Sequence, residues 1–240
     1  MIDLNSKRIF LFDLDDTLIN TSLAKEAGLK RAYQKLVSEC VADFEKLPSE
    51  EEFKSDLTYI YRTSKEENGD RFFDYDAKVF EDYCKSDSIK ALKLSHREFS
   101  LAARLCWHYR QTKNNSLMAL PGGIEILKKL GRNCKVHVIT EGKCNYQHTK
   151  AMLTDIEKDV DLVFVTKDKV SQLTEFINEI KQDKKLCVII GDNETDIKAG
   201  KEAGIDTILV KTGKRDYNKF KTEADLTIVD LNEILKLLSE

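Results

Sequence analysis

Three carboxylates and a hydroxyl follow directly after the first apolar run of the chain. The run is Ile9–Phe12; the acids Asp13, Asp15 and Asp16 come after it, and Thr17 is next. Such a run is typical of a strand that is buried on both faces of a parallel sheet. Because a buried carboxylate is costly without a partner, packing alone does not favour acids at the end of that strand. The cluster therefore indicates a bound cation or a reactive group.

The second half of the chain alternates between strand-like and helix-like segments. The sequence predicts further strands over residues 135–140, 161–166, 186–192, 206–210 and 226–229. Strands that are separated by helices of about ten residues form right-handed crossovers in a parallel sheet. The predicted fold class is therefore α/β, with a doubly wound parallel sheet. In such sheets, ligands bind beyond the carboxyl ends of the strands, where the strand order reverses.

The other polar candidates also follow predicted strands. They are Thr140, Lys167, Lys169, Asp192 and Asp196. Carboxylates, a hydroxyl and an ammonium at one sheet edge suit phosphoryl transfer, where catalysis is mostly positioning and charge neutralisation. A carboxylate attacks phosphorus only when its repulsion from the phosphate is cancelled, and Mg²⁺ cancels it by binding hard oxygen ligands. The hydroxyl and the lysine can hold the phosphate oxygens that are not transferred.

This set resembles, in order, the four motifs of the haloacid dehalogenase (HAD) superfamily, most of whose members are phosphatases. Residues 13–17 are similar to the first motif, D-x-D-x-T, and Thr140 to the second, a Ser or Thr at a strand end. Lys169 fits the third motif, with Lys167 as the alternative, and residues 191–196 fit the fourth, G-D-x-x-x-D. Short motifs match by chance, so the joint order and spacing carry the resemblance, which covers the whole chain.

Two details depart from the commoner members of this family. Asp16 stands where many members have glycine, and we assign it no catalytic role. Thr140-Glu141-Gly142, followed by Gln147 and Lys150, looks like a T-x-G…Q-x-x-K variant and not the commoner S/T-N-G. The substrate is therefore not carried over from the commoner members.

The resemblance implies a Mg²⁺-dependent phosphatase that hydrolyses a small phosphomonoester, a phosphorylated metabolite, through an aspartyl-phosphate intermediate. It implies Asp13 as the nucleophile and Asp15 as the general acid and base. The implied metal ligands are the Asp13 carboxylate, the Asp15 main-chain carbonyl and Asp192. Asp196 would act behind these ligands or on a metal-bound water. Thr140 and Lys169 would hold the phosphate.

The region between the first and second predicted strands has no strand pattern. We predict that residues 20–118 form an inserted helical cap domain and that residues 1–19 and 119–240 form the catalytic core. Apolar residues at helical spacing from Leu29 to Cys40 predict one helix face, and Ser49 with Glu52 forms a capping box that starts another helix. Ser95 with Glu98 forms a second capping box, which predicts the start of a later helix. The segment 99–109 is apolar on nearly all sides and is predicted to be the central helix of the insert.

Composition excludes several other classes. The 240 residues carry a net charge of −3, which does not favour nucleic-acid binding through phosphate neutralisation. No apolar run approaches the ~20 residues that span a bilayer, and the N-terminus lacks a signal-peptide pattern. We therefore expect a soluble, cytoplasmic protein without a membrane partner. The six cysteines are scattered without C-x-x-C, which favours reduced thiols over disulfides or a zinc site.

Three alternatives stay open at this point. A phosphomutase acting on sugar phosphates would share every core residue. A haloacid dehalogenase would use Asp13 against carbon and would leave Asp15 and Asp192 without a purpose. A non-catalytic binding module could retain the same fold. A P-loop or dinucleotide-binding module lacks support, because neither G-x-x-x-x-G-K-[S/T] nor G-x-G-x-x-G occurs.

Overall fold

The chain divides into two compact units. The computed structural model describes residues 2–40, 47–68, 75–90 and 98–238. The first unit joins Met1–Ser22 with Leu117–Glu240, and the second is Leu23–Ser116. The sequence predicted that the core consists of residues 1–19 and 119–240, so the first unit is slightly larger than expected.

Hydrogen bonds account for the shifted junctions. Asn20 donates its backbone N–H to the carbonyl of Met118 at 3.1 Å, and its side-chain oxygen accepts the Met118 N–H at 2.8 Å. The backbone N–H of Ser22 donates to the Asp16 carboxylate at 2.7 Å. These contacts hold the start of the first helix against the first unit.

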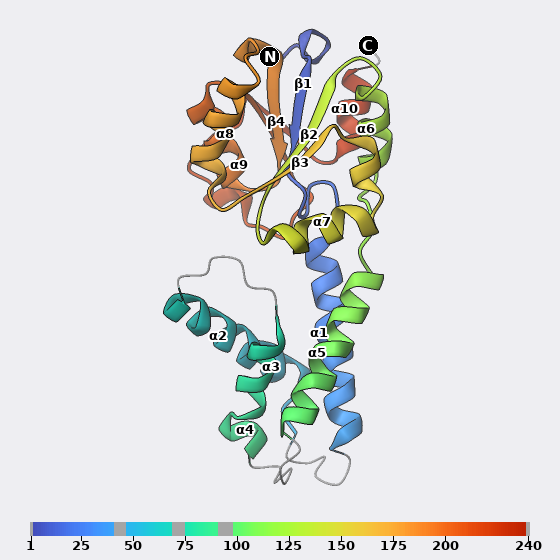
Figure 1. The fold of residues 1–240 in the computed structure, drawn as a ribbon, viewed down its shortest axis with the longest axis vertical. Helices are drawn as coiled ribbons and strands as arrows, with labels where there is room; N and C mark the ends of the chain where they lie inside the picture. The colour runs from blue at the N-terminus through green and yellow to red at the C-terminus, as the bar shows by residue number, and fades with distance from the viewer. Residues whose placement is uncertain (1, 41–46, 69–74, 91–97, 239–240) are drawn as a thin grey trace. The chain divides into compact units, whose positions relative to one another are not determined.

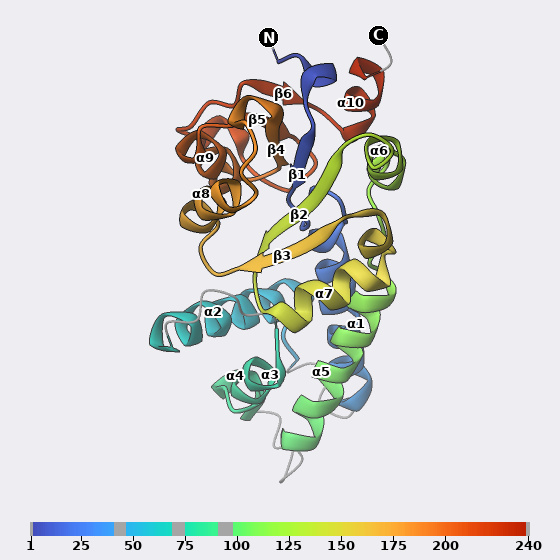
Figure 2. The same ribbon diagram turned by 45° about the horizontal axis from the view of Figure 1, so that its top comes forward.

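The strands of the described chain form one parallel sheet in the first unit, in the order β3-β2-β1-β4-β5-β6 (Figure 2). Their bounds are β1 Ile9–Phe12, β2 Lys135–Glu141, β3 Leu162–Thr166, β4 Cys187–Gly191, β5 Asp206–Val210 and β6 Leu226–Ile228. Each was predicted, and the ends differ by at most one residue.

β1 lies at the point where the strand order reverses. The chain proceeds from β1 to β2 and β3 on one side, then returns to place β4 on the other side. Phe12 at the end of β1 is in register with Val138 of β2 and Ile190 of β4. All residues of β1 are buried, which explains their unbroken apolar character. The residues that follow Phe12 and Ile190 therefore meet at one edge of the sheet.

Helices cover both faces of this sheet. They are α6 Gly123–Leu130, α7 Cys144–Leu153, α8 Lys169–Glu179, α9 Glu194–Ala203 and α10 Leu231–Leu237, with short 3₁₀ turns at Leu4–Ser6, Ile156–Asp159, Lys184–Leu186 and Tyr217–Lys219. Figure 1 shows α8 and α9 on one face and α6 and α10 on the other. Leu173 of α8 and Ala199 of α9 pack in one core cluster with Leu11 of β1 and Ile189 of β4. The predicted α/β class with a doubly wound sheet is confirmed.

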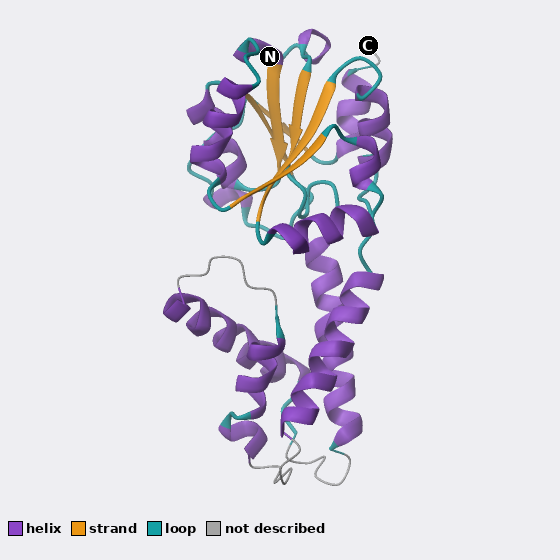
Figure 3. Ribbon diagram, viewed as in Figure 1, coloured by secondary structure: helices purple, strands orange, loops and turns teal. Residues whose placement is uncertain are grey.

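The second unit contains only helices among its described residues (Figure 3). They are α1 Thr21–Glu39, which begins in the first unit, α2 Glu50–Asn68, α3 Ala77–Cys84, α4 Asp87–Lys90 and α5 Glu98–Asn115. Phe53 packs against Tyr33 and Tyr83 in the core, with ring centroids 5.6 and 5.0 Å apart. The predicted capping box starts α2, because Ser49 donates its N–H to Glu52 at 2.8 Å and accepts the Glu52 N–H at 3.2 Å. Ser95 of the second predicted box lies outside the described residues.

One expectation for this unit was wrong. The segment 99–109 is not buried on all sides, since Phe99 is 61% and Trp107 is 56% exposed. The buried residues of α5 instead follow one helix face: Leu101, Ala102, Leu105, Cys106 and Tyr109. An amphipathic helix needs only one apolar stripe, and additional apolar residues on the outer face do not bury it further.

The structure also bears on the cysteines and on membrane-spanning helices. All six cysteines are free, as predicted. Among the residues that the structure describes, no helix has the length and apolar character needed to cross a bilayer.

The packing of α9 on the sheet gives a stability prediction. A Cβ added at Gly200 would lie 2.4 Å from Thr207 Cγ2 and 2.5 Å from Ile189 Cγ2. Gly200→Ala should therefore lower the free energy of unfolding by about 1–3 kcal/mol through overpacking. This loss outweighs the higher helix propensity of alanine compared with glycine. Urea unfolding followed by far-UV circular dichroism measures the change. The control is Lys198→Ala on the exposed face of α9, which should stay within about 0.5 kcal/mol of the unsubstituted protein. A more stable Gly200→Ala variant would contradict this packing.

Candidate active site

The loop after β1 is held by its own hydrogen bonds. Asp13 continues the ladder between β1 and β4, because its N–H donates to the carbonyl of Ile190 at 2.9 Å. Asp16 has a φ of 59°, in the left-handed region, which explains why glycine suits this position. Its carboxylate accepts the N–H of Ser22 at 2.7 Å and also the Ser22 hydroxyl. A carboxylate at the first turn of α1 is favourable, so Asp16 has an evident structural use.

Four of the predicted site residues form one cluster of close contacts. Asp13, Asp192 and Asp196 each offer a carboxylate oxygen, and these atoms lie within 4.8 Å of one another. Lys169 donates its Nζ to Asp13 Oδ1 at 2.6 Å and to Asp196 Oδ1 at 2.5 Å. None of the four residues is more than 6% exposed. The ends of β1 and β4 and the start of α8 thus bring three acids and one lysine together.

Burial makes the charge of this cluster costly. It raises the pKa of Asp13 well above its usual value; Lys169 lowers that pKa, but Asp196, Asp192 and Asp15 raise it further. For Lys169, burial alone would lower the pKa, but the carboxylates of Asp13 and Asp196 raise it above the ordinary lysine value. Lys169 is therefore an ammonium, and the carboxylates around it still repel one another. A further cation would relieve that repulsion.

Asp192 provides a specific place for such a cation. Asp192 is fully buried. Burial raises the pKa of its carboxyl group to about 6, although the nearby Arg215 lowers that pKa. Arg215 Nε donates to Asp192 Oδ2 at 2.6 Å, whereas Oδ1 is buried and has no hydrogen-bond partner. A buried carboxylate oxygen without a partner is costly, and it is a ligand type that Mg²⁺ prefers. The cluster therefore fits a hard divalent cation.

Gly191 allows this arrangement, because a Cβ there would lie 2.2 Å from Asp196 Oδ2. That same oxygen accepts the N–H of Asn193 at 3.0 Å and so caps α9. Asp196 Oδ1 is occupied by Lys169. Both oxygens of Asp196 are thus engaged by protein donors, which fits a role behind the metal ligands and not direct coordination.

Asp15 and Thr140 are joined through Gln147 of α7. Gln147 Nε2 lies 3.0 Å from Asp15 Oδ2 and 3.0 Å from Thr140 Oγ1. Lys150, also on α7, donates its Nζ to Asp15 Oδ1 at 2.5 Å and to Oδ2 at 2.6 Å. Thr140 is 1% exposed at the end of β2. Gln147 and Lys150 of the T-x-G…Q-x-x-K segment therefore contact Asp15, the second predicted acid.

The structure distinguishes the two candidate lysines. Lys169 is the first residue of α8 and is buried against Asp13, whereas Lys167 is exposed in the preceding turn. The carboxylate of Glu141 accepts the backbone N–H of Lys169 at 2.8 Å and so fixes the start of α8. The geometry therefore favours Lys169 as the lysine of the site.

Sequence reasoning missed Arg215 and Thr21. Arg215 pairs with Asp192, and the Thr21 hydroxyl donates to the Asp15 carboxylate. Arg215 follows β5, and the rule that ligands bind beyond strand ends would have covered it. Thr21 has no sequence signal, because a threonine at the start of a helix is common for other reasons.

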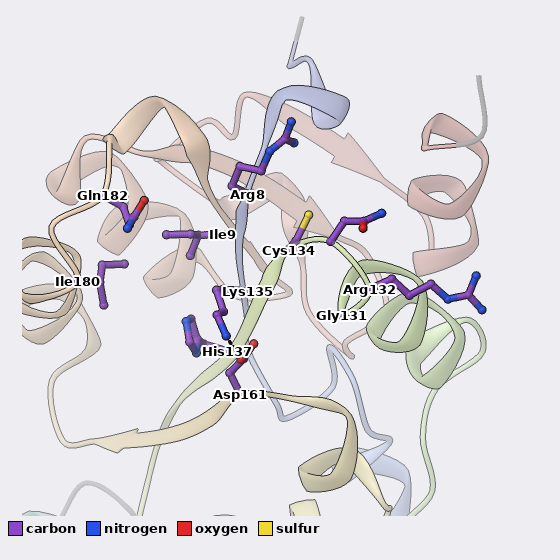
Figure 4. Close-up of a pocket in the computed structure, with 11 residues that line it drawn as sticks. Arg8, Ile9, Gly131, Arg132, Cys134, Lys135, His137, Asp161, Ile180 and Gln182 are labelled. Carbon is purple, nitrogen blue, oxygen red and sulfur yellow. Dashed lines mark hydrogen bonds and ion pairs between the residues drawn. The ribbon is translucent and has the colours of Figure 1, made fainter.

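A separate cavity of about 720 Å³ lies at the opposite ends of the strands. Arg8, Ile9, Cys134, Lys135, His137 and Asp161 are among its lining residues (Figure 4). Its lining includes none of the predicted site residues. Two of its cations are already engaged, since Arg8 donates to backbone carbonyls and Lys135 to Asp161. The acidic cluster, not this cavity, is the candidate active site.

Known proteins are similar to this chain in sequence and in fold. Residues 166–234 match the family model described as HAD-hydrolase-like. A glyceraldehyde 3-phosphate phosphatase from Pyrococcus furiosus is 23% identical over 247 residues, which cover 96% of this chain and 92% of that protein. The family model over residues 166–234 and this relative support a HAD-like hydrolase, the class that the sequence motifs predict.

Solved structures with the same fold differ in activity. A Thermotoga maritima protein, provisionally assigned as a β-phosphoglucomutase, has a TM-score of 0.67 at 16% identity, with 97% of this chain and 98% of that chain covered. A 2-haloacid dehalogenase from Pseudomonas syringae has a TM-score of 0.65 at 17% identity, with the same coverage. Because one fold carries several reactions, the choice of reaction depends on the site residues.

The contrast between the two lysines gives a prediction. Lys169→Met would leave Asp13 and Asp196 buried without their cation. Its free energy of unfolding should fall by about 3–5 kcal/mol, the range for breaking a buried ion pair. Lys167→Met is the matched control and should stay within about 0.5 kcal/mol, because that side chain is exposed. Chemical denaturation at neutral pH without divalent cations measures both. Equal losses in the two variants would contradict the assignment of Lys169 to the site.

Proposed function

We propose that this protein is a Mg²⁺-dependent phosphatase that hydrolyses a small phosphomonoester through an aspartyl phosphate on Asp13. The observation that carries the proposal is the buried cluster in which Asp13, Asp192 and Asp196 lie within 4.8 Å of one another around Lys169. Structural packing gives no reason to gather these acids. Phosphoryl transfer gives such a reason, because the charge of the phosphate must be neutralised beside a nucleophilic carboxylate.

In the first step, a carboxylate oxygen of Asp13 attacks phosphorus. The new O–P bond forms while the ester O–P bond breaks, and Asp15 gives its proton to the leaving alcohol. Lys169 stays charged beside Asp13 and offsets the charge of the nucleophile and the phosphate. Thr140, at the end of β2, would donate its hydroxyl to a phosphate oxygen.

In the second step, water hydrolyses the aspartyl phosphate. Asp15, now ionised, takes a proton from that water as the water oxygen attacks phosphorus. The O–P bond to Asp13 breaks, which releases inorganic phosphate and restores the carboxylate. One acid thus serves both steps, first as donor and then as acceptor.

The residues that would hold the cation are the Asp13 carboxylate, the Asp15 main-chain carbonyl and Asp192 Oδ1. Arg215 holds the other oxygen of Asp192 and so orients the carboxylate. Mg²⁺, when bound, supplies charge neutralisation at the phosphate. Asp196 acts through Lys169 and through the start of α9.

The substrate class follows from the same reasoning and from one relative. The printed activity of the Pyrococcus furiosus relative, a phosphatase of glyceraldehyde 3-phosphate, supports a small phosphorylated metabolite as the substrate here. We propose that Leu23–Ser116 is a cap that selects the leaving group and excludes water from the reaction. The buried Asp192 favours this chemistry over a haloacid dehalogenase, which would leave Asp15 and Asp192 without a purpose.

Hydrolysis of p-nitrophenyl phosphate tests the reaction class. We expect release of nitrophenolate that requires Mg²⁺ and stops with EDTA. Asp13→Asn should lower it by at least about a thousandfold, because the nucleophile is lost. Release of chloride from a haloacid without metal would favour a dehalogenase. Transfer of phosphate between positions of a sugar, without net hydrolysis, would favour a phosphomutase. Inactivity towards a broad panel of phosphate esters would favour a binding module.

The role of Asp15 has its own test. Asp15→Asn should slow hydrolysis of an alkyl phosphate by about 10²–10⁴-fold, because a poor leaving group needs the proton. The same variant should change the first step with p-nitrophenyl phosphate far less, since nitrophenolate leaves without a proton. Pre-steady-state release of nitrophenolate isolates that step. Equal losses with both esters would count against Asp15 as the acid.

A further inference from the structure

Two side chains from one face of α7 converge on Asp15. Gln147 and Lys150 are three residues apart, so they lie on the same side of the helix. Lys150 Nζ contacts both carboxylate oxygens of Asp15, at 2.5 and 2.6 Å, and Gln147 Nε2 contacts Oδ2 at 3.0 Å. The Thr21 hydroxyl donates to Oδ1. Each oxygen of Asp15 therefore has two donor contacts.

These contacts differ from those of an ordinary surface ion pair. The Lys150 side chain is only 13% exposed, and the Gln147 residue is 3% exposed. Exposed pairs contribute little, because water replaces them and the side chains rotate freely. Here both donors are held on α7: Lys150 makes two contacts and Gln147 one, and Thr21 makes the fourth. Together these contacts restrict rotation of the Asp15 carboxyl group.

Gln147 also connects Asp15 to the phosphate-binding candidate. Its amide lies within 3.0 Å of Thr140 Oγ1 and 2.5 Å of the Glu141 carbonyl. A displacement of Gln147 would therefore move Asp15 relative to Thr140. The segment from β2 to α7 thus sets the distance between the group that holds the phosphate and the group that handles the proton.

We propose that Lys150 is a positioning residue that fixes the Asp15 carboxylate in line with the leaving-group oxygen, with Gln147 as its partner. This inference rests on the proposed phosphatase function. Proton transfer needs the acid within hydrogen-bond reach of the leaving oxygen, and a carboxylate that rotates loses that geometry. Lys150 acts through Asp15 and does not touch the substrate. Its loss therefore affects only reactions that need the proton.

The test compares leaving groups in Lys150→Met. Hydrolysis of the best alkyl phosphate from a metabolite screen should fall about 10²-fold in kcat, the lower end of the range for acid–base catalysis. Nitrophenolate release in the first step with p-nitrophenyl phosphate should change less than about threefold, because that leaving group needs no proton. Lys150→Arg, which keeps the charge and several donors, should recover most of the alkyl phosphate activity. Equal losses on both esters, or no loss on either, would overturn the proposal.

Two further variants separate positioning from damage to the fold. Lys158→Met removes a lysine that is 74% exposed and paired with the exposed Asp155, and it should leave both activities unchanged. In an Asp15→Asn background, Lys150→Met should cause little further loss, because its effect acts through Asp15. Independent, multiplied losses in the double variant would also overturn the proposal.

A measurement without activity keeps the inference testable if the proposed function fails. The urea midpoints of Asp15→Asn, Lys150→Met and the double variant form a double-mutant cycle. We expect the double variant to shift the midpoint by less than the sum of the two single shifts, because both remove one contact. If the shifts are coupled but the protein hydrolyses no phosphate ester, the phosphatase function and the catalytic role of Lys150 would be overturned. The contact between Lys150 and Asp15 would still stand. Additive shifts would overturn the contact itself.

Discussion

The repulsion among buried carboxylates where the strand order reverses is the constraint on which the rest of the site depends. Asp13, Asp192 and Asp196 are nearly inaccessible to water, and two protein cations, Lys169 and Arg215, contact them. Burial raises the pKa of Asp13 and Asp192 because the charged forms lose hydration. Such an arrangement persists only when the surrounding structure holds every member in place. In the function that we propose, a bound cation would relieve this repulsion and allow a phosphate to approach.

The fold meets this constraint by giving most site groups a second contact. The N–H of Asp13 belongs to the β1–β4 ladder, and Lys169 is fixed through the carboxylate of Glu141. Asp196 caps α9 with the oxygen that Lys169 does not use. Arg215 leaves one oxygen of Asp192 available for a ligand. Asp13, Lys169 and Asp196 are therefore each held at a strand end or a helix start.

The same fold carries different reactions in other proteins, so these contacts matter more than the architecture. A sheet edge with one nucleophilic carboxylate can attack carbon or phosphorus. In the function that we propose, Asp192 after β4 and the donors around Asp15 favour attack on phosphorus. In this proposal, α7 is a functional element, because it reaches both Asp15 and Thr140.

The sequence by itself determined the strands, their parallel class and the acids at their ends. These features are local: an unbroken apolar run, a strand-to-helix alternation and a carboxylate spacing can each be read within a few residues. The sequence preferred Lys169 and kept Lys167 as the alternative; the structure adds that only Lys169, at the start of α8, is buried against Asp13. Tertiary structure alone decided the exposed face of α5, the junctions near Ser22 and Leu117, and the pairing of Asp15 with Lys150. That pair is 135 residues apart in the chain, and no local pattern specifies which distant side chains a folded sheet brings into contact.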